Sequence, residues 1–279
     1  NSAYQPLDPN IFKKLINFLI ENFQIISFQE INKKNYQKTF EENKPKIILS
    51  FDDGYKDFIE VVHPILIQHG IRANLNIIPS CVEKNRPPFN VILQDFIGKN
   101  NKDDYTKLDI PEYKWDENLS KIEEGIKLST FVKDKPFIQQ LDIENYCYEQ
   151  IGQTLYKNAT EMMNIKDILL IKDSHDLGAH SFRHSNMGSE SDEYFLNDLN
   201  LCSKWFLDNL DICPYIYAFP NGSYKNSNLE MAKENGYSQL LLVEDKFSRI
   251  SNDIHPRFGF YAFSEKEMVY KSTGSLVKL

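Results

Sequence analysis

The pattern of hydrophobic and polar positions predicts alternating helices and strands in the first part of the chain. Asp8-Pro9 is typical of a helix start, and apolar residues at helical spacing follow it. Apolar runs that end in polar residues predict strands at 25–28, 46–51 and 73–78. The segment 57–69 predicts a helix that Gly70 ends. This β-α-β order favours parallel strands joined by helices.

The stretch from 84 to 165 breaks this alternation. It is polar and rich in Lys, Asn and Asp, and apolar residues recur at helical spacing over 122–128 and 138–155. Beyond it, strands are predicted at 176–180, 215–219 and 239–243, and helices after the Ser189/Asp192 capping pattern and at 227–235. We therefore expect one domain over residues 1–279, with 84–165 as a mostly helical insertion or lid.

Composition narrows the class of protein. A chain of 279 residues with 41% hydrophobic and 26% charged residues can bury the core of one large α/β domain. The net charge of −8 disfavours nucleic acid and anionic membranes as partners. No apolar run is long enough to predict a transmembrane segment. The sequence leaves the oligomeric state open.

The four cysteines show no Cys-x-x-Cys spacing, which argues against a zinc ribbon or a redox motif. Unpatterned cysteines slightly favour the bacterial cytoplasm over the periplasm or the exterior. Residue 1 is Asn rather than Met, so we also consider a removed leader, which would reverse that assignment.

Candidate chemistry lies at the ends of predicted strands, where parallel α/β folds build their active sites. The first motif is Ser50-Phe51-Asp52-Asp53-Gly54. Two adjacent carboxylates after a buried strand are costly unless something uses them, and one can bind a metal while the other acts as a base. The alternative is a surface turn whose acids cap the next helix.

Two further motifs follow in the chain. His180 and His184 have the spacing of two imidazoles on one face of a helical turn, which can share a metal ion. The alternative is a pair of unrelated surface histidines. The segment 217–224, Tyr-Ala-Phe-Pro-Asn-Gly-Ser-Tyr, predicts a strand that enters a tight loop able to present backbone N–H groups, or an ordinary turn.

The combination points to hydrolytic metal chemistry. One Asp with two His is a three-ligand set that leaves positions open for water and substrate. A neighbouring free Asp supplies the base that activates the water. A haloacid-dehalogenase-type phosphatase is excluded, because it needs an Asp where Phe51 stands.

In this order the three motifs resemble the polysaccharide deacetylase family, also called the NodB-homology or carbohydrate esterase family four. Residues 50–54 match its Thr-Phe-Asp-Asp-Gly motif with Ser for Thr, 180–184 match His-Ser/Thr-x-x-His, and 217–222 match the third motif loosely. The resemblance covers residues 8–82 and 167–261. It implies a distorted (β/α) barrel of about seven strands and a divalent metal, usually Zn²⁺.

The resemblance also implies roles for individual residues. Asp53, His180 and His184 would be the metal ligands, and Asp52 would take a proton from the metal-bound water. The backbone N–H of Asn221, which follows Pro220, would help to hold the oxyanion.

Two family positions are not matched directly. Many members carry an Arg in the third motif, where this chain has Ala218, and Arg257 is the candidate substitute; a surface ion pair is the alternative for it. His255 is a candidate for the family's general acid, which otherwise lies elsewhere or is absent. Tyr55 and Tyr224, which flank the motifs, are candidates to stack on a sugar ring.

The expected function is a metal-dependent hydrolase that removes an acetyl or other acyl group from an N-acetylated sugar or polysaccharide. The resemblance favours an amide over an ester bond. The large insertion favours a specific biosynthetic substrate, such as a cell envelope glycan. The alternative is a catalytically inactive, carbohydrate-binding relative of the deacetylases.

Overall fold

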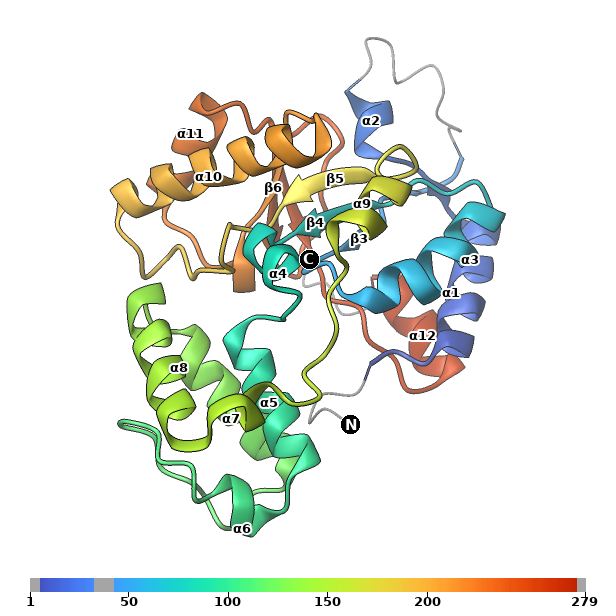
Figure 1. Cartoon of the computed structure of the whole chain (residues 1–279). Helices are drawn as coiled ribbons and strands as arrows, with labels where there is room; N and C mark the ends of the chain where they lie inside the picture. Colours follow the sequence, from blue (N-terminus) through green and yellow to red (C-terminus); the bar gives the residue numbers. More distant parts are fainter. Residues whose placement is uncertain (1–5, 33–42, 275–279) are drawn as a thin grey trace.

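A curled sheet of six parallel strands forms the centre of the computed structural model, which describes residues 6–32 and 43–274. The strands are neighbours in chain order, and helices pack around them (Figure 1). They are β3 (Ser50–Phe51), β4 (Asn74–Ile77), β5 (Asp176–Ala179), β6 (Ile216–Ala218), β7 (Gln239–Val243) and β8 (Ile254–Arg257). This half-barrel with surrounding helices confirms the predicted distorted (β/α) barrel.

A separate parallel pair, β1 (Gln24–Ile25) and β2 (Lys46–Ile47), extends the curl beyond β3. The predicted strand 46–51 is therefore divided: its first half pairs with β1 and its second half with β4. The predicted strand 25–28 ends early, because Ser27 caps a short helix in a capping box with Glu30. The pattern did not predict β8.

The helices connect the strands and cover the sheet. Between β3 and β4, Pro64 has no N–H to donate, and the chain forms a π-helix (Phe58–Val62) before α3. The bounds are α1 Pro9–Asn22, α2 Phe28–Ile31, α3 His63–Gln68, α4 Pro79–Lys84, α5 Phe89–Lys99, α6 Lys102–Tyr105, α7 Lys121–Lys133, α8 Phe137–Ile151, α9 Ile165–Ile171, α10 Asp192–Leu210, α11 Asn226–Glu234 and α12 Glu265–Ser272. The N-cap of α10 is Ser191 and not Ser189, so the predicted capping pattern was wrong by two residues.

Strand β4 shows how the sheet separates apolar from polar side chains. Leu75 and Ile77 pack into the core between the sheet and helices α9 and α10. Asn74 and Asn76 point to the opposite face, where their amides hydrogen-bond to each other and to Ser50. Successive residues of a strand point to opposite faces, so the inner surface of the curled sheet is polar below the motif at 50–54.

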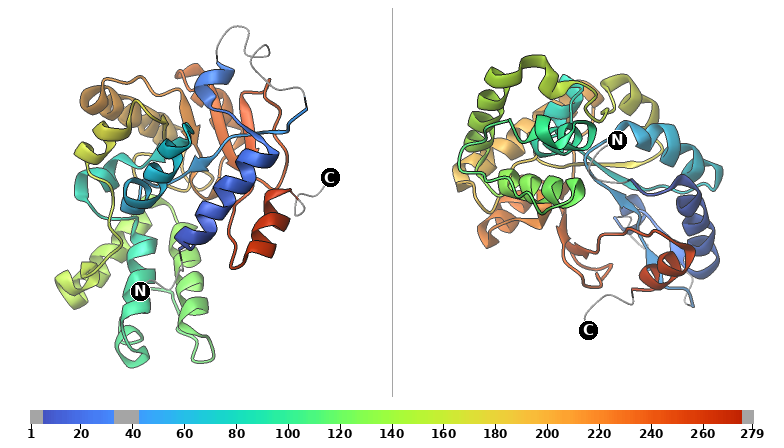
Figure 2. Two further views of the ribbon diagram at one scale, coloured as in Figure 1. Left: turned by 90° about the vertical axis from the view of Figure 1, so that its right-hand side faces the viewer. Right: turned by 90° about the horizontal axis from the view of Figure 1, so that it is seen from below.

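The helices α5 to α8 form a lobe beside the barrel, drawn in green in Figures 1 and 2. Its apolar side chains between Phe89 and Leu155 make a hydrophobic cluster of their own. Three hydrogen bonds join it to the segment after His184: Asn186 to the Lys133 carbonyl, Ser189 to the Asp134 carbonyl, and the Phe137 N–H to Glu190. Within the described ranges, no helix has the length and apolar character needed to cross a membrane, and all four cysteines are free thiols.

Candidate active site

Asp53, His180 and His184 converge at the carboxyl ends of β3 and β5. Asp53 Oδ1 lies 3.4 Å from His180 Nε2 and 3.5 Å from His184 Nε2. One atom from each residue lies within 4.8 Å of the other two. Asp53 Oδ1 is buried and has no hydrogen-bond donor among the described residues. A buried carboxylate oxygen without a donor is costly, so this donor set fits a divalent cation.

The two histidines meet through a loop and not through the helical turn that their spacing predicted. Residues 180–185 contain no helix. Ser181 and His184 both adopt positive φ angles of 59°, which fold the chain back so that the two rings lie 5.1 Å apart. Non-glycine residues rarely hold such angles unless their surroundings enforce them.

Asp198 on α10 stabilises this loop conformation through hydrogen bonds. Its buried carboxylate accepts hydrogen bonds from Ser181 Oγ (2.9 Å), the Phe182 N–H (2.9 Å) and the Tyr217 hydroxyl (3.0 Å). Ser181 Oγ in turn accepts from the Ser185 N–H. Burial raises the pKa of Asp198 to about 6, although these donors oppose the shift. Asp198 is a positioning residue that the sequence analysis missed.

The orientation of each histidine suits a ligand. His180 Nδ1 lies 2.8 Å from the carbonyl oxygen of Ala218. A carbonyl only accepts, so Nδ1 carries the proton and leaves Nε2 free to face Asp53. Burial lowers the pKa of His184 to about 4, despite the opposing charge of Asp53. The His184 ring is therefore neutral at ordinary pH, as metal binding requires.

Asp52 faces the same cavity from the end of β3. Its Oδ2 lies 3.9 Å from His180 Nε2. Arg257 donates two hydrogen bonds to Asp52, from Nη1 to Oδ1 at 2.8 Å and from Nη2 to Oδ2 at 2.9 Å. Asn76 donates a third, to Oδ1 at 2.7 Å. Burial by itself would raise the pKa of Asp52, but Arg257, His180 and Asn76 outweigh it and hold that pKa well below its usual range.

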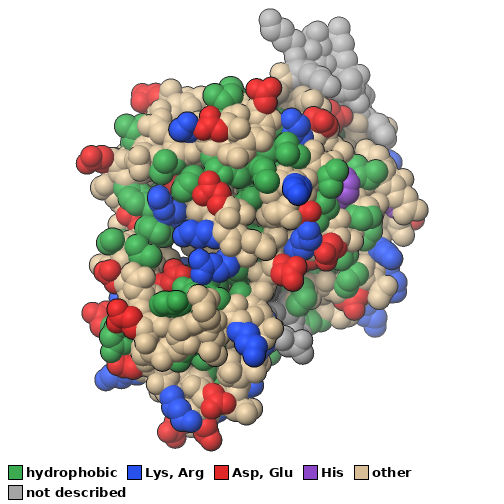
Figure 3. Space-filling model, viewed as in Figure 1, with side chains coloured by type: hydrophobic (Ala, Val, Ile, Leu, Met, Phe, Trp, Pro, Cys, Tyr) green, Lys and Arg blue, Asp and Glu red, His purple; other side chains and the backbone are tan. Residues whose placement is uncertain are grey.

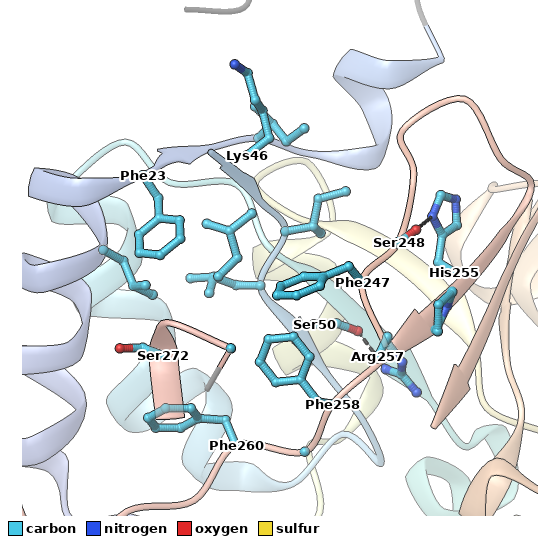
Figure 4. Close-up of a pocket in the computed structure, with 18 of the residues that line it drawn as sticks. Phe23, Lys46, Ser50, Phe247, Ser248, His255, Arg257, Phe258, Phe260 and Ser272 are labelled. Carbon is cyan, nitrogen blue, oxygen red and sulfur yellow. Dashed lines mark hydrogen bonds between the residues drawn. The ribbon is translucent and has the colours of Figure 1, made fainter. Parts of the chain in front are cut away.

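The structure thus places Arg257, at the end of β8, against Asp52. Arg257 is the residue that we considered as a substitute for the family's Arg, whose place Ala218 takes here. Its Nη1 also donates to Ser50 Oγ at 2.8 Å (Figure 4). An apolar cavity of about 510 Å³ lies beside this pair, between the edge strands β1–β2 and β8. Phe23, Phe247, Phe258 and Phe260 are among the side chains around it in Figure 4.

His255 does not join this group. Its ring is buried on β8, with Nδ1 2.7 Å from Ser248 Oγ and Nε2 2.6 Å from Gln239 Oε1. Burial lowers its pKa to about 4. Because both ring nitrogens are engaged by other side chains, the geometry does not support His255 as the general acid.

The third motif forms the loop after β6. Pro220 is buried, and Asn221 is exposed with a φ angle of 57°. Tyr224 packs against Phe219, and its hydroxyl donates to Glu244 at 3.0 Å. The loop lies beside the site, because Ala218 at the end of β6 binds His180.

Sequence reasoning also missed Asn76, and it did not place Tyr55 against Asp53. Asn74-x-Asn76 in an otherwise apolar strand places two amides on one face, which was an available signal. Burial and the Asp53 carboxylate, to which it hydrogen-bonds, raise the pKa of Tyr55. Its hydroxyl therefore stays protonated and helps to orient Asp53.

The chain is similar to known deacetylases in part of its sequence and in its fold. The family model described as polysaccharide deacetylase matches residues 141–240. No curated protein sequence matches the chain. A deacetylase from Streptococcus pyogenes, PplD, solved in complex with acetate, superposes with a TM-score of 0.60 at 14% identity, over 96% of this chain and 88% of that one.

Two further solved structures share the fold. A de-N-acetylase from Aggregatibacter actinomycetemcomitans has a TM-score of 0.58 at 16% identity, covering 92% of this chain and 89% of its own. IcaB from Ammonifex degensii has a TM-score of 0.57 at 12% identity, covering 93% and 87%. Part of this chain therefore matches the polysaccharide deacetylase family model, and the chain shares its fold with these three solved structures.

Proposed function

We propose that this protein is a metal-dependent hydrolase that removes acetyl groups from an N-acetylated sugar or polysaccharide. The observation that carries the proposal is the convergence of Asp53, His180 and His184 with an ionised Asp52 on the open side of the same cavity. A divalent cation held by the first three residues, which we assign as Zn²⁺, would supply Lewis acidity toward the acyl carbonyl and water.

Residues of the chain would supply the base, its positioning and the oxyanion contact. Asp52 accepts a proton from the attacking water, because it is ionised and faces the ligand group. Arg257 and Asn76 keep both Asp52 oxygens in place by hydrogen bonds. We assign the Asn221 N–H to the developing oxyanion, with Pro220 shaping that loop and Tyr224 lining it. No catalytic role is assigned to His255.

We propose further that residues 1–279 act as one domain in which 84–165 forms a wall of the substrate groove. Its hydrogen bonds to the segment after His184 support this arrangement. A biosynthetic cell envelope glycan fits a groove that a dedicated insertion narrows.

The decisive experiment measures products. Zinc-loaded protein is incubated with N-acetylglucosamine oligomers, and acetate and primary amine are quantified together. We expect the two to appear in equal amounts, because amide hydrolysis releases one of each. Oligomer binding without acetate release would favour the inactive, sugar-binding alternative. Acetate without amine, from an O-acetylated oligomer only, would favour ester hydrolysis.

Replacing Arg257 by methionine is expected to move the acid limb of the kcat/KM profile to higher pH. Asp52 must be ionised to act as a base, so activity is lost as the pH falls through its folded-state pKa. Removing the guanidinium removes the main group that holds the Asp52 pKa down, so the effect of burial, which raises that pKa, is opposed only by His180 and Asn76. The measurement is kcat/KM against pH for metal-loaded protein; an unmoved acid limb would show that Arg257 does not act through Asp52.

A further inference from the structure

Two half-buried cations, Lys133 and Arg183, lie where the insertion meets the loop that carries His180 and His184. Lys133 is the last residue of α7. Arg183 directly precedes His184, and its guanidinium rests on the rings of Phe137 and Phe182 at 5.4 Å and 5.0 Å. In the space-filling view, Lys and Arg side chains gather beside a hollow at the seam between the insertion and the barrel (Figure 3).

Several other half-buried cations in the described residues contact a carboxylate directly. The nitrogen–oxygen distances in these ion pairs are 2.7 Å for Lys56–Asp167, 2.6 Å for Arg72–Asp176, 2.9 Å for Lys135–Glu112 and 2.8 Å for Arg257–Asp52. In residues 6–32 and 43–274, neither Lys133 nor Arg183 has a carboxylate oxygen within ion-pair distance. Arg183 acts on the buried Asp198 only at longer range. A partly desolvated cation without a direct counter-ion is stabilised when an anion binds it.

The backbone near these two side chains is fixed. The Lys133 carbonyl accepts from Asn186 at 3.2 Å, and the Phe137 N–H donates to Glu190 at 2.5 Å. The cations therefore have a defined place beside the metal ligands.

We propose that Lys133 and Arg183 bind an anionic group, a phosphate or a carboxylate, of the glycan that this site deacetylates. The substrate is then an acidic glycan and not a neutral one. The claim that the anionic glycan is a substrate rests on the proposed function, whereas the claim that it binds at these cations does not. The chain as a whole carries a net negative charge that repels anions. Two half-buried cations at one place therefore select for where an anion binds as well as for its charge.

The test compares three pentamers of N-acetylglucosamine that differ only in the group at C6: a neutral hydroxymethyl group, a 6-phosphate or a carboxylate. For zinc-loaded protein at low ionic strength, we expect KM for a charged pentamer to be lower by about tenfold, the effect of one charge-assisted contact. The advantage shrinks as salt is added, since salt screens exposed charges. The phosphate and carboxylate arms identify which anion is preferred.

Lys133→Gln and Arg183→Gln are each expected to remove most of this discrimination, and Lys133→Arg to keep it. The matched control is Lys121→Gln, the same change at the exposed opposite end of α7. Zinc affinity is measured for every variant, because a displaced His184 would lower it while a lost anion contact would not.

Direct binding of the three pentamers, measured by calorimetry, separates this inference from the proposed function. Preferential binding of a charged pentamer that depends on Lys133, without acetate release, supports the anion site and refutes the deacetylase. Equal KM and equal affinity for neutral and charged pentamers, with acetate released from all, refutes the anion site and supports the deacetylase. Equal affinity without acetate release refutes both.

Discussion

Asp52→Asn is expected to lower the turnover number for acetate release by about a thousandfold, within the range that general bases contribute. Asparagine has nearly the same size and still offers an oxygen to Arg257 and Asn76, but it cannot take a proton from water. Asp53, His180 and His184 are unchanged, so zinc affinity is expected to stay within a few-fold of the original value. Turnover and zinc affinity are measured on the same preparations.

The matched control for this change is Asp57→Asn, the same substitution on an exposed side chain of the following turn. It is expected to leave turnover unaltered. Asp52→Asn protein that bound zinc normally and kept more than a tenth of its turnover would refute the assignment of Asp52 as the base.

His184→Ala is expected to weaken zinc binding by at least about 100-fold, since residues that merely orient metal ligands already contribute 10–100-fold. Acetate release is lost in parallel at zinc concentrations that saturate the original protein. Binding is measured by competition with a coloured chelator. Thermal unfolding gives a second readout: zinc raises the melting temperature of the original protein by binding the folded state, and this shift disappears in the variant.

His69→Ala serves as the control, because His69 is exposed at the end of α3. It is expected to bind zinc as the original protein does. If His184→Ala bound zinc with undiminished affinity, the three-ligand site and the proposed metal chemistry would both be wrong, whatever activity the variant showed.

The sequence by itself determined the fold class and the chemical types at the site. Runs rich in apolar residues predicted β3 to β7, and in β4 the apolar residues alternate with Asn74 and Asn76 on the polar face. Asp52 and Asp53 follow such a run directly, so the chain geometry alone puts two carboxylates at a strand end. The spacing of His180 and His184 limited them to one neighbourhood, although it did not reveal the loop that joins them.

Contacts between distant segments were decided only by the tertiary structure. Arg257 reaches Asp52 because the sheet curls until β8 lies near β3, and no local pattern encodes that curl. His255, two residues earlier on the same strand, sits deeper and bonds to Gln239 and Ser248 instead. Local sequence made both residues candidates, for different roles, and only their positions along β8 decide which of them reaches Asp52.

The positive φ angles at Ser181 and His184 have the same origin. A non-glycine residue gives no sign in sequence that it will hold such an angle. The conformation exists because Asp198, on a helix that follows in the chain, accepts hydrogen bonds from Ser181 and Phe182. Residue types and short spacings set which groups are available, whereas the packing of helices on the sheet sets which of them meet.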